Sequence, residues 1–338
     1  LLHPYNEAPW EDQVLRESLE LRTVRAVAAA KATLEAGFTT LRDLGTEGAG
    51  FADVALRDAI AKGIVQGPRV FATTRAIVAT GCYGPSGFDP RWEVPKGAQE
   101  ATGVDGVRRA VREQVAAGAD LIKVYADYRR RNGQPPTPTF SQDELNAIVD
   151  EATSAGLPVA AHAFTDEAIQ RAVLARVATI EHGFDASDEV LGLMRERGVV
   201  LCPTLTAGES VARYGGWKPG MPDDPRIKEA KEMFARALRS GVTIACGSDV
   251  GVFAHGENAR ELELMVAYGM SPLEALRAAT TTAAKVLRRE KDLGRVAQGY
   301  VADLIAVRGD TLADLVTVTK PVIVLKEGKI GVDRRGRP

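Results

Sequence analysis

The sequence predicts an α/β protein whose strands and helices alternate to form a (β/α)8 barrel, and two repeated patterns support this class. Helical segments end at a glycine that is followed by a short strand, as in EAGFTTLRD, AAGADLIKVY and RSGVTIACGSD. Glycine suits this junction because a helix often ends in a left-handed backbone conformation, which glycine adopts without strain. Seven short apolar runs predict strands that are each followed by a helix: 39–43, 69–72, 121–125, 159–163, 178–181, 199–203 and 243–248.

The apolar runs are almost continuous rather than alternating, which is typical of parallel strands covered on both faces. An open, doubly wound sheet is the alternative fold, but it would leave the clustering of polar strand ends described below unexplained. A closed barrel needs eight strands. Residues 11–36 predict one long helix with no strand before it. We therefore expect strand 1 to end just upstream of Leu1, and we expect this chain, which does not begin with methionine, to be truncated there.

The helix starts are equally legible in the sequence. Ser141 with Glu144, and Ser271 with Glu274, predict capping boxes in which the serine and glutamate side chains bond the free N–H groups of the first turn. One junction departs from the pattern, because Arg176 stands where the other junctions have glycine.

Stretches rich in proline and glycine follow three of the predicted strands, at 79–103, 132–140 and 203–225. In a barrel of this class the loops that follow the strands carry the active site. After the helices that end near Leu287, short β-runs separated by turns replace the helical pattern. We therefore predict a barrel over residues 1–291 and a small β appendage, the remnant of a β-sandwich, over residues 292–338.

Composition excludes several classes of function. The 338 residues include 43 Lys and Arg against 45 Asp and Glu, and a net charge of −2 favours neither nucleic acid nor an anionic membrane as partner. No apolar run reaches the roughly 18 residues that span a bilayer, and the polar start LLHPYNEAPWEDQ is unlike a signal peptide. Cys82, Cys202 and Cys246 are scattered and form no CxxC pair, which predicts buried thiols in a reducing cytoplasm.

Four polar residues end predicted strands: Lys123 in LIKVY, His162 in VAAHA, His182 in TIEHG and Asp249 in TIACGSD. The carboxyl ends of parallel barrel strands share one face, so these side chains are expected to converge there. The chain has only four histidines, and two of them end consecutive strands. This arrangement indicates a metallohydrolase.

Each residue alone also has a structural interpretation. His162 could be a hydrogen-bonded histidine of the core, and His182 could pair with the adjacent Glu181. Asp249 could cap the next helix. Lys123 lies inside an apolar strand, where an unpaired ammonium is costly, so its structural interpretation is a salt bridge to Asp43 or Asp127.

Together the four residues favour a metal site. Imidazole and carboxylate suit a borderline cation such as zinc, and an open coordination position would activate water. A protonated lysine cannot bind a metal ion, because its ammonium group has no free lone pair. Burial and nearby positive charge would lower the pKa of Lys123, and the neutral amine could react with CO₂ to give a carbamate, an anionic bridging ligand. This carbamate is a hypothesis.

The ordered set of motifs resembles the amidohydrolase superfamily, in particular its branch of imidazolonepropionase-like enzymes and metal-dependent dipeptidases. The resemblance covers essentially the whole chain, and it is carried by these segments: TTLRDLG, LIKVY, VAAHA, TIEHGF, GSDVG, SPLEALRAATTTAAKVL and GYVADLIAV. It implies a (β/α)8 barrel with a composite β-sandwich and a site for one or two metal ions.

By this resemblance Lys123 would be the carboxylated ligand that bridges two metals, and His162 and His182 would hold the second metal. Asp249 would bind the first metal, take a proton from the bridging hydroxide and pass it to the leaving amine. The expected reaction is hydrolysis of a C–N bond in an amide, a cyclic amide or a dipeptide.

The chain departs from the family at strand 1, because the His-x-His pair that would hold the first metal is absent. His3 is no substitute, since LLHPY holds no second histidine. Two alternatives therefore stay open. The chain could be a catalytically impaired fragment or scaffold, or the same metal site could hydrolyse a lactone or a phosphoester.

Four further residues are candidates for contact with a small-molecule substrate. Tyr125 points to the same side as Lys123, and His255 lies in the loop after the last strand. Arg75 and Tyr83 lie in the long loop after residues 69–72, where an arginine could pair with a substrate carboxylate. Dipeptidase-like relatives carry a histidine in this loop, whereas ATGCYGPSGF has none, which weighs against a dipeptide. A homo-oligomer is an open possibility.

Overall fold

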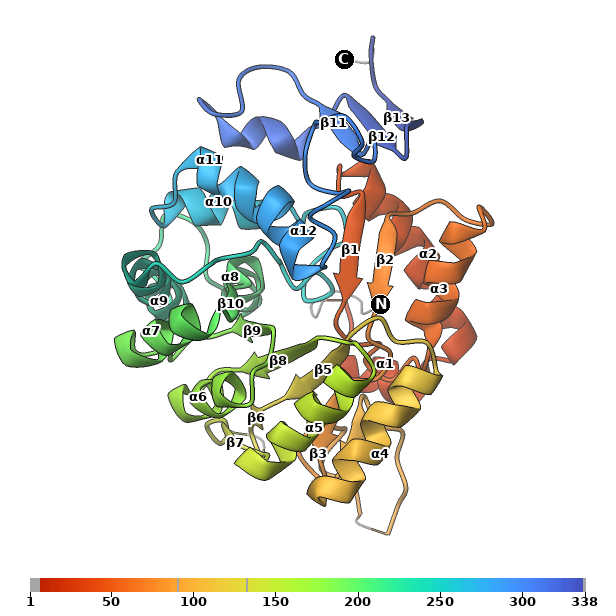
Figure 1. The fold of residues 1–338 in the computed structure, drawn as a ribbon, viewed down its shortest axis with the longest axis vertical. Coiled ribbons are helices and arrows are strands. Elements are labelled where there is room, and N and C mark those ends of the chain that lie inside the picture. The colour runs from red at the N-terminus through yellow and green to blue at the C-terminus, as the bar shows by residue number, and fades with distance from the viewer. Residues whose placement is uncertain (1–6, 90, 132, 337–338) are drawn as a thin grey trace.

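The chain forms a curved wall of parallel strands with helices packed along its outer face (Figure 1). The computed structural model describes residues 7–89, 91–131 and 133–336, so His3 lies outside the described residues. The strands of the wall are β1 (Thr40–Asp43), β2 (Arg69–Ala72), β3 (Ile77–Ala79), β4 (Gln99–Ala101), β5 (Ile122–Tyr125), β8 (Val159–Ala163), β9 (Thr179–His182) and β10 (Val200–Cys202). A short antiparallel pair, β6 (Asp127–Tyr128) and β7 (Thr137–Pro138), lies beside it.

Among the described residues, two helices precede β1, and the other helices come after it in the chain. The helices are α1 (Trp10–Arg16), α2 (Leu19–Glu35), α3 (Ala52–Ala61), α4 (Gly103–Ala116), α5 (Gln142–Ser154), α6 (Asp166–Leu174), α7 (Asp188–Arg197), α8 (Leu205–Tyr214), α9 (Pro225–Ser240), α10 (Arg260–Ala267), α11 (Pro272–Arg277), the π-helical turn η1 (Ala278–Thr282) and α12 (Ala283–Val286). Both predicted capping boxes, at Ser141 and Ser271, are confirmed.

The strand order is that of a barrel wall. Strands β10, β9, β8, β5, β3 and β4 form one parallel sheet in that order, and β1 pairs with β2 in parallel. The backbone N–H of Asp120, just before β5, donates to the carbonyl of Ala72 in β2 at 2.7 Å, which joins the two sheets. Among the described strands, none other than β2 pairs with β1.

Of the seven predicted strands, six are confirmed and the seventh is reduced to a single bridge. Residues 243–248 touch β10 through a parallel bridge between Leu201 and Ile244. The chain passes very close to β10 here, since a Cβ on Gly247 would lie 2.3 Å from Sγ of Cys202. Residues 243–248 therefore contact β10 through a few backbone atoms and do not form a continuous strand pairing with it.

Three other expectations are wrong. The helix predicted over 11–36 is two helices, because Ser18 accepts a hydrogen bond from the N–H of Leu21 and begins α2. Strand β2 is followed by β3 and β4 before α4, so a helix does not follow every strand. The stretch 203–225, which we expected to be a loop, contains α8.

The glycine junctions adopt the predicted conformation, with φ of +99° at Gly37 and +71° at Gly241. Arg176 has a φ of +67°, so it takes the same left-handed conformation despite its side chain. Arg176 therefore differs from the other junctions in residue type but not in backbone conformation.

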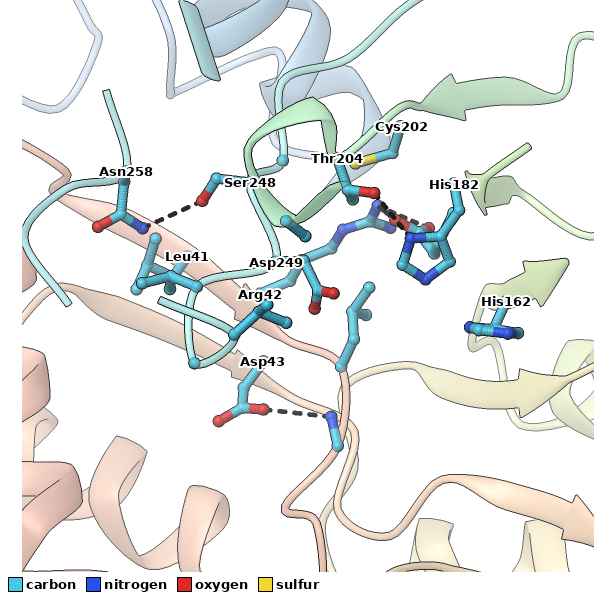
Figure 2. A pocket seen from close by; sticks show the side chains of 18 of the residues that line it. Leu41, Arg42, Asp43, His162, His182, Cys202, Thr204, Ser248, Asp249 and Asn258 are labelled. Atoms are coloured by element: carbon cyan, nitrogen blue, oxygen red, sulfur yellow. Dashed lines mark hydrogen bonds and ion pairs between the residues drawn. The ribbon is translucent and has the colours of Figure 1, made fainter. Parts of the chain in front are cut away.

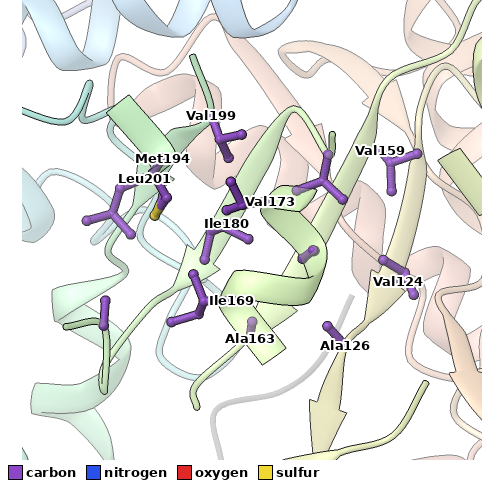
Figure 3. Packing of buried hydrophobic residues seen from close by; sticks show 14 of the residues in the cluster. Val124, Ala126, Val159, Ala163, Ile169, Val173, Ile180, Met194, Val199 and Leu201 are labelled. Atoms are coloured by element: carbon purple, nitrogen blue, oxygen red, sulfur yellow. The ribbon is translucent and has the colours of Figure 1, made fainter. Parts of the chain in front are cut away.

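The core lies between the wall and its helices (Figure 3). Ile180 of β9 and Leu201 of β10 are fully buried against Ile169, Val173 and Met194 of the neighbouring helices. In β5 the apolar Ile122 and Val124 face this layer. By strand alternation, Lys123 and Tyr125 face the inside of the wall.

The C-terminal residues form an antiparallel sheet of β11 (Leu304–Ala306), β12 (Ile323–Lys326) and β13 (Lys329–Asp333), with a 3-10 turn η2 (Leu315–Thr319). Arg69 of β2 joins this sheet to the wall, because its guanidinium contacts Asp303 at 2.8 Å and Glu327 at 2.7 Å. The division of the chain into domains at residues 291 and 292 stays a prediction. Within the described residues, no helix combines the length and the apolar character needed to cross a membrane.

Candidate active site

A cavity of about 720 Å³ runs along the inside of the wall and includes the carboxyl ends of β5, β8, β9 and β10. Its lining includes seven of the eight residues that the sequence singled out, namely Tyr83, Lys123, Tyr125, His162, His182, Asp249 and His255. Figure 2 shows the two imidazoles side by side, with the carboxyl group of Asp249 across the cavity from them. These strand ends therefore border one cavity, and the roles of their side chains stay predictions.

The two histidines form the tightest part of the site. The ring centroids of His162 and His182 are 4.6 Å apart, and the rings are nearly perpendicular. Tyr125 stacks on His162 at 4.4 Å. Nε2 of His162 is buried and has no hydrogen-bond partner; its nearest acidic atom is Oδ1 of Asp127 at 3.7 Å. This orphaned nitrogen is unlike a histidine that is bonded into the core.

Both imidazoles are held neutral. Burial, reinforced by the charges of His182 and Lys123, lowers the pKa of His162 well below its ordinary value. Burial and Lys123 lower the pKa of His182 to about 3. A neutral imidazole is the form that binds a metal ion.

The backbone turns His182 into the cavity. In the β8–β9 register His182 lies opposite Ala163, which is buried in the outer apolar layer. Strand alternation would point His182 the same way, but its φ of +75° reverses the direction at the strand end. Thr204 and Asp249, at φ of +50° and +56°, are also left-handed at this rim. Such strained residues collect at functional sites.

Lys123 is buried, and burial lowers the pKa of its amine although Glu181 and Asp249 act in the opposite direction. No carboxylate of the described residues lies within ion-pair distance of the amine, so the alternative salt bridges to Asp43 and Asp127 do not form. The amine lies 5.4 Å from the ring centroid of Tyr125.

Asp249 caps no helix, because the next helix, α10, begins after Ala259. Burial raises the pKa of the Asp249 carboxyl to about 6, although the charge of Lys123 lowers it. A carboxyl group with a pKa in this range can both take up and release a proton near neutral pH.

Sequence reasoning missed an ion pair inside the wall. Arg42 of β1 binds Glu181 through one nitrogen at 2.8 Å from each carboxylate oxygen, and it also donates to Thr179 at 3.0 Å. Burial raises the pKa of Glu181, but Arg42 and Lys123 outweigh it and hold that pKa below its ordinary value. Charged residues of opposite sign in the middle of two apolar runs were the signal in the sequence. The same pair explains why Glu181 does not pair with His182.

Arg75 is the one candidate that lies outside the cavity lining. Its guanidinium lies 5.0 Å from the ring centroid of Phe51 and 3.6 Å from Glu113 on α4. The preceding Thr74 has a φ of +66° and donates its N–H to Asp53 of α3, while the N–H of Arg75 donates to Gln114 of α4 at 3.3 Å. Arg75 therefore lies apart from the other candidates, and its contact with substrate stays a prediction.

The donor set fits part of a metal site. Over residues 7–89, 91–131 and 133–336, no three His, Cys, Asp or Glu side chains are close enough to hold an ion together. His162 and His182 do fit two positions of a divalent metal, since they are neutral, adjacent and buried, and Nε2 of His162 lacks a partner. A carbamate on Lys123 would add an anionic oxygen ligand.

Comparison with known proteins gives the family. Residues 6–331 match the amidohydrolase family, and the chain belongs to it. The ochratoxinase of Aspergillus niger is 33% identical over 325 residues, which cover 88% of this chain and 65% of that protein. The imidazolonepropionase of Symbiobacterium thermophilum is 29% identical over 181 residues, 51% of this chain and 38% of that protein. The chain thus spans about two thirds or less of these curated relatives.

Solved structures agree with this assignment. A Xaa-Pro dipeptidase with methionine bound in its active site has a TM-score of 0.83 and 36% identity, over 92% of this chain and 79% of that one. The crystal structure of A. niger ochratoxinase has a TM-score of 0.79 and 29% identity, over 93% of this chain and 76% of that one. These neighbours confirm the barrel class predicted from the sequence.

Proposed function

We propose that this chain is a metal-dependent hydrolase that cleaves a C–N bond in an amide, a cyclic amide or a dipeptide. The observation that supports it is the meeting of His162, His182, Lys123 and Asp249 around one cavity. The family membership and the similarity to an ochratoxinase and a Xaa-Pro dipeptidase point to the same class of reaction.

In this proposal His162 and His182 hold a divalent metal ion, zinc by the chemistry of the ligands, and a carbamylated Lys123 completes the set. When bound, such an ion polarises the substrate carbonyl and lowers the pKa of water. The low pKa values of the two imidazoles keep them available as ligands without competition from protons.

Asp249 is the proposed proton shuttle. Its carboxylate takes a proton from the attacking water and gives it to the nitrogen of the leaving group when the C–N bond breaks. The pKa of about 6 lets the same group act first as base and then as acid at neutral pH.

The cavity suits a small molecule with an apolar or aromatic part. Phe164 and Phe184 stack at 5.2 Å, and Tyr125 continues this aromatic wall toward Tyr83. Glu47 accepts hydrogen bonds from Tyr83 and from Tyr125, which holds both rings in place. We include in the proposal a cytoplasmic location, consistent with three cysteines that form no disulfide.

A hydrolysis screen with an active-site variant tests the function. Purified chain supplied with zinc and bicarbonate is expected to hydrolyse at least one of N-acyl amino acids, Xaa-Pro dipeptides and cyclic amides. Asp249→Asn should lower kcat by roughly 10²–10⁴-fold while zinc content is largely kept, because the shuttle is lost. Asp185→Asn, a carboxylate that lines the same cavity, is the matched control and should keep turnover. No hydrolysis in the wild type, or equal turnover in Asp249→Asn, would refute the proposal.

A further inference from the structure

The end of β10 contains a threonine in an unusual conformation. Thr204 has a φ of +50°, although a β-branched residue is strained in the left-handed region. It precedes α8 as the N-cap residue, yet its side chain makes no capping hydrogen bond. Its hydroxyl lies instead 2.7 Å from Nδ1 of His182 (Figure 2). The hydroxyl of Thr204 therefore contacts His182 instead of a backbone N–H group in the first turn of α8.

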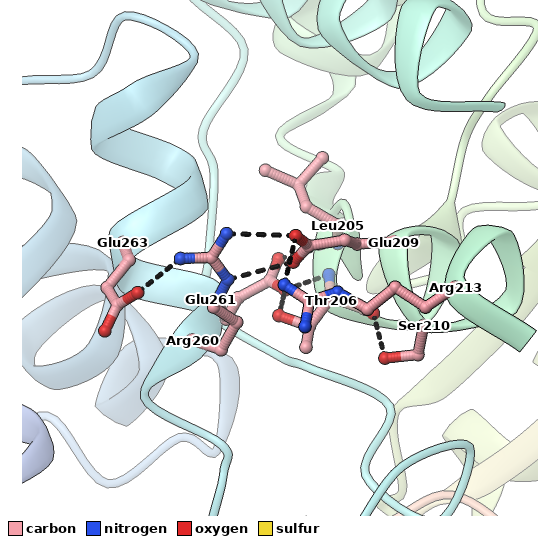
Figure 4. Close-up of polar contacts among 8 residues, drawn as sticks. All are labelled: Leu205, Thr206, Glu209, Ser210, Arg213, Arg260, Glu261 and Glu263. Atoms are coloured by element: carbon pink, nitrogen blue, oxygen red, sulfur yellow. Dashed lines mark hydrogen bonds and ion pairs between the residues drawn. The ribbon is translucent and has the colours of Figure 1, made fainter. Parts of the chain in front are cut away.

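A carboxylate from another helix caps α8 in its place. Glu261 of α10 is fully buried, and Oε1 accepts the N–H of Leu205 at 2.9 Å. Oε2 accepts the N–H of Thr206 and its hydroxyl, both at 2.8 Å (Figure 4). Burying a carboxylate costs free energy unless hydrogen bonds compensate it. The three hydrogen bonds to Glu261 supply that compensation.

We propose that Glu261 is a positioning residue for His182 and acts through Thr204. Because Glu261 holds the first N–H groups of α8, the hydroxyl of Thr204 is left to accept the Nδ1–H of His182. This fixes the imidazole tautomer with its lone pair on Nε2, directed into the cavity.

The surroundings favour this tautomer. A neutral imidazole carries one proton, and Thr204 oxygen is its partner at Nδ1. Lys123 acts on His182 as a positive charge, and both residues line the cavity. In the metal-free protein, where Lys123 carries no carbamate, this charge favours a lone pair over a proton on the ring nitrogen that faces the cavity, and with Nδ1 at Thr204 that nitrogen is Nε2. A histidine that ligates a metal generally donates its other N–H to such a partner, so the consequence for metal binding rests on the proposed function.

A purely structural role for Glu261 makes different predictions, and the same cluster offers a matched control. Glu209 of α8 is also buried, and it binds Arg260 at 2.9 and 3.0 Å and Arg213 at 2.8 Å. Its carboxylate bonds neither Leu205 nor Thr206. Glu209→Gln therefore perturbs the same helix without touching the cap.

Nitrogen-15 NMR of histidine-labelled, metal-free protein tests the proposal directly. The signal that disappears in His182→Ala identifies His182, and in the wild type it should show a protonated Nδ1 and a bare Nε2. Thr204→Val, which has the same shape but no hydroxyl, should populate both tautomers. Glu261→Gln should do the same, because its amide turns a donor toward the N–H groups of α8. Glu209→Gln and Thr204→Ser should retain the wild-type signal.

Zinc titration is the second measurement, with affinity expected to fall roughly 10–100-fold in Thr204→Val and Glu261→Gln but not in Glu209→Gln. A wild-type His182 with its proton on Nε2 would overturn the proposal. An unchanged His182 signal in Thr204→Val would overturn it as well, even if Glu261→Gln does not fold. The NMR result does not depend on turnover, so failure of the proposed hydrolysis and failure of this inference are distinguishable.

Discussion

The ends of β8 and β10 are built by the same device. At β8, the buried Asp127 accepts the N–H of Phe164 and both the N–H and the hydroxyl of Thr165. At β10, Glu261 accepts the N–H of Leu205 and both the N–H and hydroxyl of Thr206. In each case one carboxylate holds two consecutive backbone groups where a strand passes into a helix, and burial raises its pKa, to about 6 for Asp127 and to about 7 for Glu261.

The two strand ends differ in what the hydroxyl of the threonine contacts. At β8, Thr165 receives the hydrogen bond of Ala168 and caps α6 itself, while His162 lies on the strand and needs no intermediary. At β10, Thr204 turns back to His182 of the neighbouring strand. One histidine is thus positioned by its own strand and the other by a contact across strands, and the predictions on Glu261 and Asp127 below test that distinction.

The largest expected effect is on metal content. His162→Ala and His182→Ala should each reduce bound zinc to near zero, because each removes half of the proposed imidazole pair. His255→Ala, which alters another histidine of the cavity lining, should leave the content unchanged. Metal analysis of purified protein decides this, and full zinc content in His182→Ala would remove His182 from the ligands.

Lys123 tests whether β5 contributes to the same centre. Lys123→Ala should lose turnover, because no carbamate can form, and added short carboxylic acids should restore part of it by supplying the missing oxygen ligand. Rates measured with and without acetate or propionate give the answer. Full activity in the variant without any added acid would exclude the carbamate.

The pH dependence of the unfolding free energy should distinguish Glu261, which caps α8, from Glu209, which lies on α8. The pKa of Glu261 is raised from 4.5 to about 7, so its stabilising contribution is fully present below pH 4.5 and is lost as the pH rises through about 7. Relative to Glu261→Gln, the wild type should therefore lose on the order of 3 kcal/mol of unfolding free energy between these pH values. Urea unfolding at pH 5 and pH 8 measures the change.

Glu209 provides the control for that experiment. Burial raises its pKa, but Arg260 and Arg213 outweigh burial and keep the pKa below its ordinary value. Its contribution is therefore present above pH 4.5 and changes little between pH 5 and pH 8. An equal pH dependence in Glu209→Gln and Glu261→Gln would contradict the assignment.

The smallest expected effect concerns Asp127. Asp127→Asn replaces one accepting oxygen with a donor that faces an N–H, so unfolding free energy should fall by about 1–3 kcal/mol. The His182 tautomer should not change, because Asp127 acts at the end of β8 alone. Denaturant unfolding together with the NMR signal of His182 tests both parts, and a changed tautomer would remove the distinction between the two strand ends.

The sequence was sufficient to predict most of the barrel and the residues that line its cavity. Lys123, His162 and His182 could be found because a polar residue within or at the end of an apolar strand stands out locally. Thr204 and Glu261 could not, since they are 57 residues apart and their roles arise from contacts between distant segments. A left-handed threonine carries no signature in the sequence, and the proline and glycine content of residues 203–225 predicts a loop where α8 forms.

The three left-handed residues at the cavity rim, His182, Thr204 and Asp249, have a consequence for engineering and for evolution. Each stores backbone free energy that glycine would release. Selection for heat resistance alone would therefore favour their replacement, at the expense of the side chains that the rim exists to present. At these three positions a more stable residue would cost activity. A thermostable variant should therefore keep them and gain its stability from substitutions elsewhere.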